Sequence, residues 1–97
     1  MSKIDRNVNQ IGKLIRLYAK NIGKEEEYLE AKLKNHWVDI VGQSIANQTT
    51  MISISNHKVY IKISSPIVKN QLLQVRENLK NYITKFIDYQ IDSIAIF

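Results

Sequence analysis

The spacing of apolar residues along the chain changes from three or four to two at about Thr49. Two runs of alternating apolar residues follow, formed by Ile52 and Ile54, and then by Val59, Ile61 and Ile63. A period of two is typical of a strand that has one face in a hydrophobic core. Asn56-His57 separates the two runs, and asparagine tolerates the positive φ of a tight turn. We therefore predict a β-hairpin between residues 49 and 64.

Two helices are predicted before the hairpin, over residues 7–22 and 25–41. Their apolar faces are Val8, Ile11, Ile15, Tyr18 and Ile22 in the first helix, and Leu29, Leu33, Trp37, Ile40 and Val41 in the second. Asn7 is the expected N-cap of the first helix, and Gly23 and Gly42 stand where the two helices should end. Trp37 lies within an apolar stripe, so we expect its indole in the core and not on the surface as a base-stacking platform.

A third helix and a closing strand are predicted after the hairpin. Ser65-Pro66 supplies a preferred N-cap followed by a preferred first helical residue. The expected core face of this helix is Val68, Leu72, Val75, Leu79, Tyr82 and Phe86. Residues 91–97 alternate again and predict the last strand. The order α-α-β-β-α-β indicates one small α+β domain over residues 1–97, with helices packed on a three-stranded sheet.

Composition excludes several classes of function. Of the 97 residues 44% are hydrophobic, which suits one small core, and no cysteine is present for a disulfide or a thiolate metal site. The two histidines, His36 and His57, lack the spacing of metal ligands. No phosphate loop or nucleophile motif occurs, and no apolar run is long enough to span a membrane. We therefore expect a cytoplasmic protein that is not an enzyme and needs no metal or cofactor.

The net charge of +5 is unevenly distributed. Residues 1–24 and residues 58–85 each hold six basic residues against one acidic residue, whereas residues 25–57 hold five acidic against two basic. Glutamates 25–27 fit the start of a helix, where the helix dipole favours negative charge, better than a metal or catalytic site. The basic balance suits a polyanionic partner, although solvated lysines are the alternative interpretation.

Two groups of cations fall on helix faces away from the predicted core stripes. The candidate nucleic-acid contacts are Lys13, Arg16 and Lys20 on the first helix, and Lys69, Arg76 and Lys80 on the third. The first group lies roughly 150° around the helix from its apolar stripe. Leu73 lies beside the second group and off the core face, so it is the candidate contact with a protein partner.

The segment from Trp37 to Ala46, WVDIVGQSIA, resembles the W-x-x-I-V-G-x-x-I-A signature of the DciA-like proteins, also called domain of unknown function 721. Further similarities follow in order: the hairpin, Ser64-Ser65-Pro66 with the Lys69-Asn70-Gln71-Leu72 segment, and the closing strand that ends at Phe97. The resemblance covers residues 8–97. From the resemblance we expect a short form of the family, without the basic tail of longer members.

The resemblance implies a KH-like fold and a role as operator or loader of the replicative DnaB helicase, with affinity for DNA. The G-x-x-G loop with which KH domains clamp nucleic acid is not found, because Gln43, Ser44 and Ile45 follow Gly42. We therefore expect a DNA-binding adaptor that contacts single-stranded or forked DNA through its basic helix faces, without sequence preference. The alternative is a protein-interaction module for helicase or another replication partner that does not touch nucleic acid. A weak homodimer through an open sheet edge is a further expectation.

Overall fold

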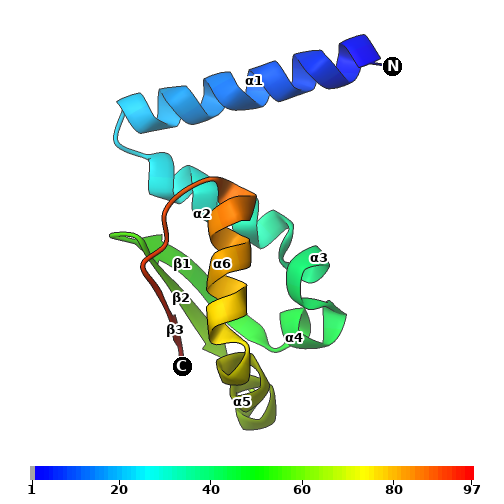
Figure 1. Cartoon of the computed structure of the whole chain (residues 1–97), viewed down its shortest axis with the longest axis vertical. Coiled ribbons are helices and arrows are strands. Elements are labelled where there is room, and N and C mark those ends of the chain that lie inside the picture. The colour runs from blue at the N-terminus through cyan, green and yellow to red at the C-terminus, as the bar shows by residue number, and fades with distance from the viewer. Residues whose placement is uncertain (1) are drawn as a thin grey trace.

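The computed structural model describes the backbone of residues 2–97 and the side chains of residues 11–97 (Figure 1). Its elements, in order, are α1 (Ser2–Asn21), α2 (Glu25–Asn35), α3 (Trp37–Val41), α4 (Gln43–Asn47), β1 (Thr49–Ser55), β2 (Lys58–Ile63), α5 (Pro66–Gln74), α6 (Arg76–Ile87) and β3 (Ser93–Ile96). This α+β arrangement confirms the predicted class. It also divides two of the predicted helices into shorter ones.

The three strands form one sheet in the order β1-β2-β3, so β2 is central. β1 and β2 are antiparallel, as the hairpin prediction required, and β3 joins β2 in parallel. Asn56 and His57 form the turn with φ values of 51° and 63°. Residues with positive φ in both turn positions match the right-handed twist of the flanking strands. From the sequence, the closing strand could lie beside either strand of the hairpin; in the structure it pairs with β2.

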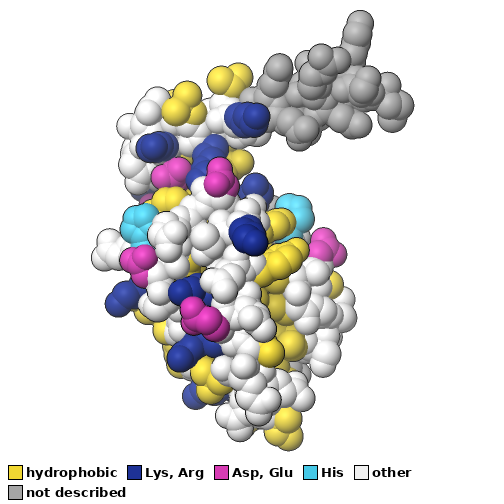
Figure 2. All heavy atoms as spheres, viewed as in Figure 1, with side chains coloured by type: hydrophobic (Ala, Val, Ile, Leu, Met, Phe, Trp, Pro, Cys, Tyr) yellow, Lys and Arg dark blue, Asp and Glu magenta, His cyan; other side chains and the backbone are white. Residues whose placement is uncertain are grey.

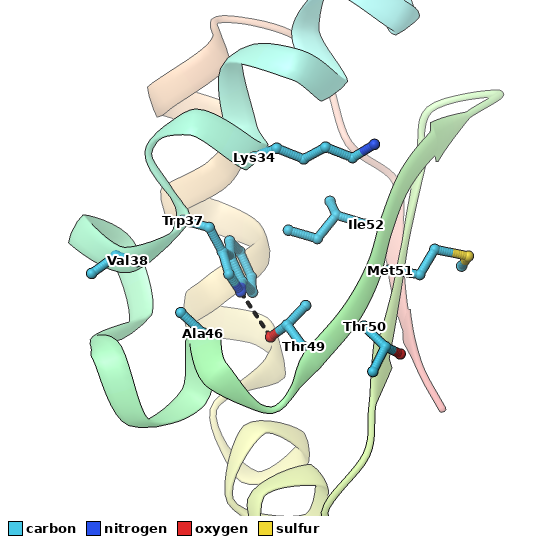
Figure 3. A pocket seen from close by; sticks show the side chains of 8 residues that line it. All are labelled: Lys34, Trp37, Val38, Ala46, Thr49, Thr50, Met51 and Ile52. Atoms are coloured by element: carbon cyan, nitrogen blue, oxygen red, sulfur yellow. Dashed lines mark hydrogen bonds between the residues drawn. The ribbon is translucent and has the colours of Figure 1, made fainter.

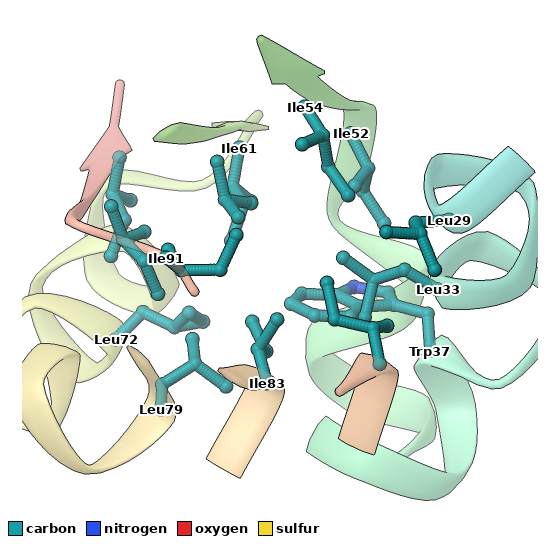
Figure 4. Close-up of a cluster of buried hydrophobic side chains, with 14 of the residues drawn as sticks. Leu29, Leu33, Trp37, Ile52, Ile54, Ile61, Leu72, Leu79, Ile83 and Ile91 are labelled. Atoms are coloured by element: carbon teal, nitrogen blue, oxygen red, sulfur yellow. The ribbon is translucent and has the colours of Figure 1, made fainter. Parts of the chain in front are cut away.

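The hydrophobic core lies between one face of the sheet and the helices α2, α5 and α6 (Figure 4). Trp37 is 3% exposed and packs there with Leu29 and Leu33, which confirms the prediction that the indole is buried. Its Nε1–H donates to Thr49 Oγ1 at 2.9 Å, and that hydroxyl donates to Ile45 O at 2.8 Å. The one polar atom of the indole is therefore paired at the edge of the core.

The predicted second helix ends at Gly42 as expected, but it is interrupted at His36, so the prediction of one continuous helix is wrong. His36 has φ −112° and ψ 10°, and its ring Nδ1 lies 3.0 Å from Lys32 O. A carbonyl only accepts, so the ring nitrogen is the donor of this bond, while the His36 backbone amide donates to Leu33 O at 3.3 Å. Gly42 ends α3 with φ 91°, a conformation that glycine adopts at no steric cost.

The predicted third helix is divided at Val75, which shifts the phase of its core face. Val75 and Tyr82 were expected inside, yet they are 48% and 53% exposed. Val75 leaves the helical conformation, with φ −111° and ψ 17°, so α6 restarts with a different rotation. Leu72 and Leu79 are buried as predicted, Val68 and Phe86 pack at the margin of the core, and Ile83 and Ile87 take the remaining core positions.

The N-cap of the third helix is confirmed at Ser65, whose hydroxyl accepts from the Val68 amide at 3.4 Å. The N-cap expected at Asn7 is wrong, because α1 already begins at Ser2. Helix α1 ends before Gly23, which has φ 76° as a glycine after a helix should. Figure 1 shows α1 standing apart from the sheet at one end of the molecule.

The burial of Trp37 predicts the response of the fold to its removal. Trp37→Ala should lower the free energy of unfolding by about 3–5 kcal/mol, the usual range for emptying a large aromatic site. That is a large part of the total of about 5–15 kcal/mol expected for a small domain. Val38→Ala is the matched control, because Val38 is the next residue but is exposed. It should change stability by about 0.5 kcal/mol or less.

Chemical denaturation followed by circular dichroism measures both variants. A Trp37→Ala protein that melts like the wild type would contradict the core assignment.

Candidate nucleic-acid and partner interfaces

The first basic group lies on the side of α1 that faces the C-terminal end of α6. Arg16 Nη1 donates to Ile87 O at 2.8 Å and its Nη2 donates to Asp88 O at 2.6 Å. Its Nε also forms an ion pair with Glu25 at 3.3 Å. These carbonyls end a helix, where a cation is favoured. Arg16 therefore fixes α1 to α2 and α6.

Lys13 and Lys20 are exposed and line the same hollow as Arg16, together with Leu17 and two carboxylates. The carboxylates are those of Glu25 and Asp88. The structure thus brings the three predicted cations together. Part of their positive charge is offset locally by the acidic groups that hold Arg16.

The second basic group is split between two helices by the break at Val75. Lys69 and Leu73 lie four residues apart on α5, and Arg76 and Lys80 lie four residues apart on α6. Lys80 Nζ pairs with Glu77 at 2.9 Å, whereas Arg76 is exposed. Leu73 is 37% exposed, a moderate value for a leucine. Basic side chains with an interspersed acidic group are visible along α6 in Figure 2.

A large apolar surface lies on α1, where the sequence predicted an apolar stripe. Its exposed members are Ile11, Leu14, Ile15, Leu17, Tyr18 and Ile22, each 49–65% exposed. Ala19 is the buried residue on the described part of α1. Apolar side chains stand out from this helix in Figure 2. Contiguous exposed apolar residues of this extent mark interaction sites in soluble proteins, but their spacing alone could not tell burial from exposure.

A second apolar surface is the groove between α3–α4 and α5–α6, visible as a hydrophobic band beside α6 in Figure 2. Its lining residues are Ile40, Val41, Ile45, Leu72, Val75, Asn78, Leu79 and Tyr82. The signature residues Ile40, Val41 and Ile45 pack against the core and also reach the surface here. The break at Val75 places that side chain in the groove.

A small hollow beside β1 exposes the edge of the Trp37 site (Figure 3). Figure 3 shows Ile52 directed toward Trp37, while Met51, the preceding residue, is directed away from it. The Trp37 N–H is already committed to Thr49. Lys34 is the one ionisable residue among those that line the hollow, so the hollow has no pair of groups suited to acid–base chemistry.

Glu26 holds the hairpin to α2, a role that the sequence analysis missed. Its carboxylate accepts from the backbone amides of His57 at 2.9 Å and Asn56 at 3.2 Å, and from the Tyr89 hydroxyl at 3.0 Å. The His57 and Tyr89 rings stack with centroids 4.5 Å apart. One turn further, Glu30 accepts from the Ile54 amide at 3.0 Å. In the sequence, the spacing of four places these two glutamates on the same face of a helix, and this was the signal that could have indicated their shared role.

The same contacts set the ionisation of the group. The hydrogen bond from the His57 amide, with those from Tyr89 and Asn56, lowers the pKa of Glu26 despite partial burial. Burial raises the pKa of Tyr89 to about 12, and the neighbouring Glu26 carboxylate adds to the rise. Burial also opposes ionisation of Glu30, but the Ile54 amide and Lys34 outweigh it, and its pKa is lowered. Shifts away from neutral pH suit a structural clamp, since a general acid or base works best with a pKa near 7.

Residues 10–96 match the family model described as "Dna[CI] antecedent, DciA". The chain belongs to the DciA family. This confirms the resemblance seen in the sequence, and it gives the chain a replication-related role, since the family is associated with loading of the DnaB helicase. No curated protein and no solved structure matches the chain significantly. Within residues 2–97, no helix is both long enough and apolar enough to cross a membrane.

The clamp at Glu26 predicts how stability depends on pH. The folded state lowers the pKa of Glu26 below its ordinary 4.5. Its ionised form therefore adds stability that is present above about pH 4.5 and is lost as the pH falls through the folded-state pKa. Glu26→Gln should be less stable than the wild type at pH 7, and the two should converge in acid.

Thermal melts between pH 3 and pH 8 measure this difference. Glu27→Gln is the control, because Glu27 is exposed and pairs at the surface with Lys24. It should follow the wild type, because exposed pairs contribute little. A constant difference between Glu26→Gln and the wild type at every pH would show that the carboxylate charge does not stabilise the hairpin.

Proposed function

We propose that this chain is a DNA-binding adaptor of the replicative helicase, acting in the cytoplasm without catalytic activity of its own. The observation that carries the proposal is the position of α1. It stands off the core with its apolar stripe exposed, while Lys13 and Lys20 are exposed on a different side of the same helix. An adaptor needs one surface for protein and another for DNA, and this helix offers both.

The cations on these helix faces are the proposed contacts with the DNA backbone; Lys13, Lys20 and Arg76 are exposed, and Lys69 and Lys80 are partly exposed. Lys13, Lys20, Lys69 and Arg76 form no ion pair among the described residues. Lys80 would join them after exchanging Glu77 for a phosphate. Arg16, also in the proposed set, contributes chiefly by positioning α1, because its donors are engaged with carbonyls and Glu25. Such contacts recognise phosphates and give binding that is salt-sensitive and independent of sequence.

The apolar stripe of α1 and the groove beside α6 support the protein side of the proposal. A helicase surface with exposed apolar residues would cover the stripe, and Leu73 would extend the contact on α5. The second candidate function, a protein-interaction module that never touches nucleic acid, rests on these same apolar surfaces. A weak homodimer stays a proposal too. It would use the outer edge of β3, since Glu30 already occupies the Ile54 amide at the edge of β1.

The basic faces predict a specific loss of DNA affinity. Lys69→Glu with Arg76→Glu should weaken binding to forked DNA at low salt. It should also reduce the slope of log K against log salt by about 2, or about one for each phosphate contact removed. Fluorescence anisotropy at several salt concentrations measures both quantities. The control, Lys24→Glu with Lys85→Glu, makes the same change in net charge at two other exposed lysines.

If the two double variants lose DNA affinity equally, the loss comes from the change in net charge and not from the basic helix faces. The protein-only module would be favoured if the wild type recovered purified helicase after nuclease treatment and bound no DNA at low salt. Loss of helicase after nuclease treatment would instead show that DNA bridges the two proteins.

A further inference from the structure

Within the part of the chain that the structure describes, the sheet carries helices on one face and its other face is open. The strand residues that point to the helices are all buried: Ile52, Ile54, Val59, Ile61, Ile63, Ile94 and Ile96. Side chains alternate along a strand, so the residues between them point outward. These are Met51, Ser53, Ser55, Lys58, Tyr60, Lys62, Ser93, Ala95 and Phe97, and none of them is buried. In Figure 1 the helices that pack on the sheet lie to one side of it.

The register of the strands arranges the open face around Tyr60. Ser53 on β1 and Ala95 on β3 pair with Tyr60, so small residues flank its ring across the sheet. Lys58 and Lys62 lie on the same face, two residues before and two residues after it, or about 6.6 Å away along the strand. Tyr60 is partly exposed, with a small residue beside it on each neighbouring strand and a lysine before and after it on its own strand.

An apolar row borders this arrangement. Met51 pairs with Lys62 from β1. Phe97 directly follows β3. Its amide donates to Ile61 O at 2.9 Å and its carbonyl accepts from the Ile63 amide at 2.8 Å, which sets Phe97 beside Lys62. Met51 and Phe97 are both substantially exposed. Serines and lysines alone would fit a solvated sheet face, but here they surround two aromatic rings and a methionine.

The charge of the open face suits an anionic ligand. None of its nine outward residues is acidic, and two are lysines. The carboxylate of Glu30 reaches the edge of β1, but it is paired with Lys34 Nζ at 3.2 Å and with the Ile54 amide. Aromatic rings that accept stacked bases, combined with lysines that meet the backbone phosphates, are the means by which proteins hold single strands. In a duplex the base faces are already stacked and cannot reach Tyr60.

We propose that the open face of the sheet is a binding site for single-stranded nucleic acid, with a base stacked on Tyr60 and phosphates held by Lys58 and Lys62. The site lies on a different surface from the basic helix faces. It rests on the proposed function in that both require affinity for nucleic acid. It adds a preference for single strands over duplex, which the helix faces alone would not give.

Anisotropy with a labelled oligothymidine of about 15 nucleotides, within the range of single-strand site sizes, tests the site against a duplex of equal length. Tyr60→Leu should weaken single-strand binding by about 5- to 150-fold, the loss expected for one stacked base. Duplex binding should be unchanged. Tyr60→Phe keeps the ring and should bind like the wild type. Tyr18→Leu is the matched control, the same substitution at an exposed tyrosine on α1.

Lys58→Gln with Lys62→Gln keeps Tyr60 and tests the phosphates independently. It should reduce the salt slope for the single strand by about 1.4, or 0.7 for each contact. Circular dichroism melts check that every variant is folded. If Tyr60→Leu is unfolded, the Lys58→Gln, Lys62→Gln double variant tests the site instead. An oligouridine probe shows whether the site accepts RNA as well as DNA.

The outcomes separate the two proposals. If Tyr60→Leu and the lysine pair both retain single-strand affinity, while Lys69→Glu with Arg76→Glu loses it, the sheet site is overturned and the proposed function stands. If the wild type binds neither single strands nor duplex at low salt, both are overturned.

Discussion

The packing of one sheet face is the constraint on which the rest of this structure depends. A chain of 97 residues can fill one core, and here that core is the space between the inner face of the sheet and α2, α5 and α6. Trp37 lies in this layer, and its N–H donates to Thr49. This one side chain therefore fills the core and has its polar atom hydrogen-bonded. The surfaces outside this layer are the candidates for binding. They include the stripe of α1, the groove beside α6 and the open face of the sheet.

Some of the charged residues hold the elements together, and others are left for contacts with a partner. Glu26 and Glu30 use their charge internally, because each accepts backbone amides of the hairpin and keeps β1 in place against α2. Arg16 does the same for α1 at the end of α6. Charges used in this way chiefly position the surfaces around them. The proposed contacts with DNA are made by cations that do not hold elements of the fold together, among them Lys20 and Arg76.

The sequence predicted the elements well where local chemistry decides them. The alternation around Asn56-His57 specified the hairpin, and Ser65-Pro66 specified where α5 begins. It failed where packing decides. A single residue out of helical geometry at Val75 shifted the phase of α6 and brought Ile83 into the core in place of Tyr82.

The candidate surfaces were less predictable than the fold. An apolar stripe at helical spacing has the same pattern whether a core or a partner covers it, so the exposure of α1 could not be foreseen. The outward face of the hairpin was visible in the alternation of Lys58, Tyr60 and Lys62 with buried neighbours. Its meaning depended on the absence of a helix from that side of the sheet, which a local pattern does not report.

We propose that this small domain keeps its core for stability and binds through the surfaces that the core leaves open. Amide and indole NMR shifts during titration of the wild-type protein with a single-stranded oligonucleotide test it most directly. We expect shifts at Tyr60, Ala95 and the helix cations, with the Trp37 indole N–H unmoved because it stays bonded to Thr49. A large shift of the Trp37 indole, with the amides of β2 unchanged, would contradict it.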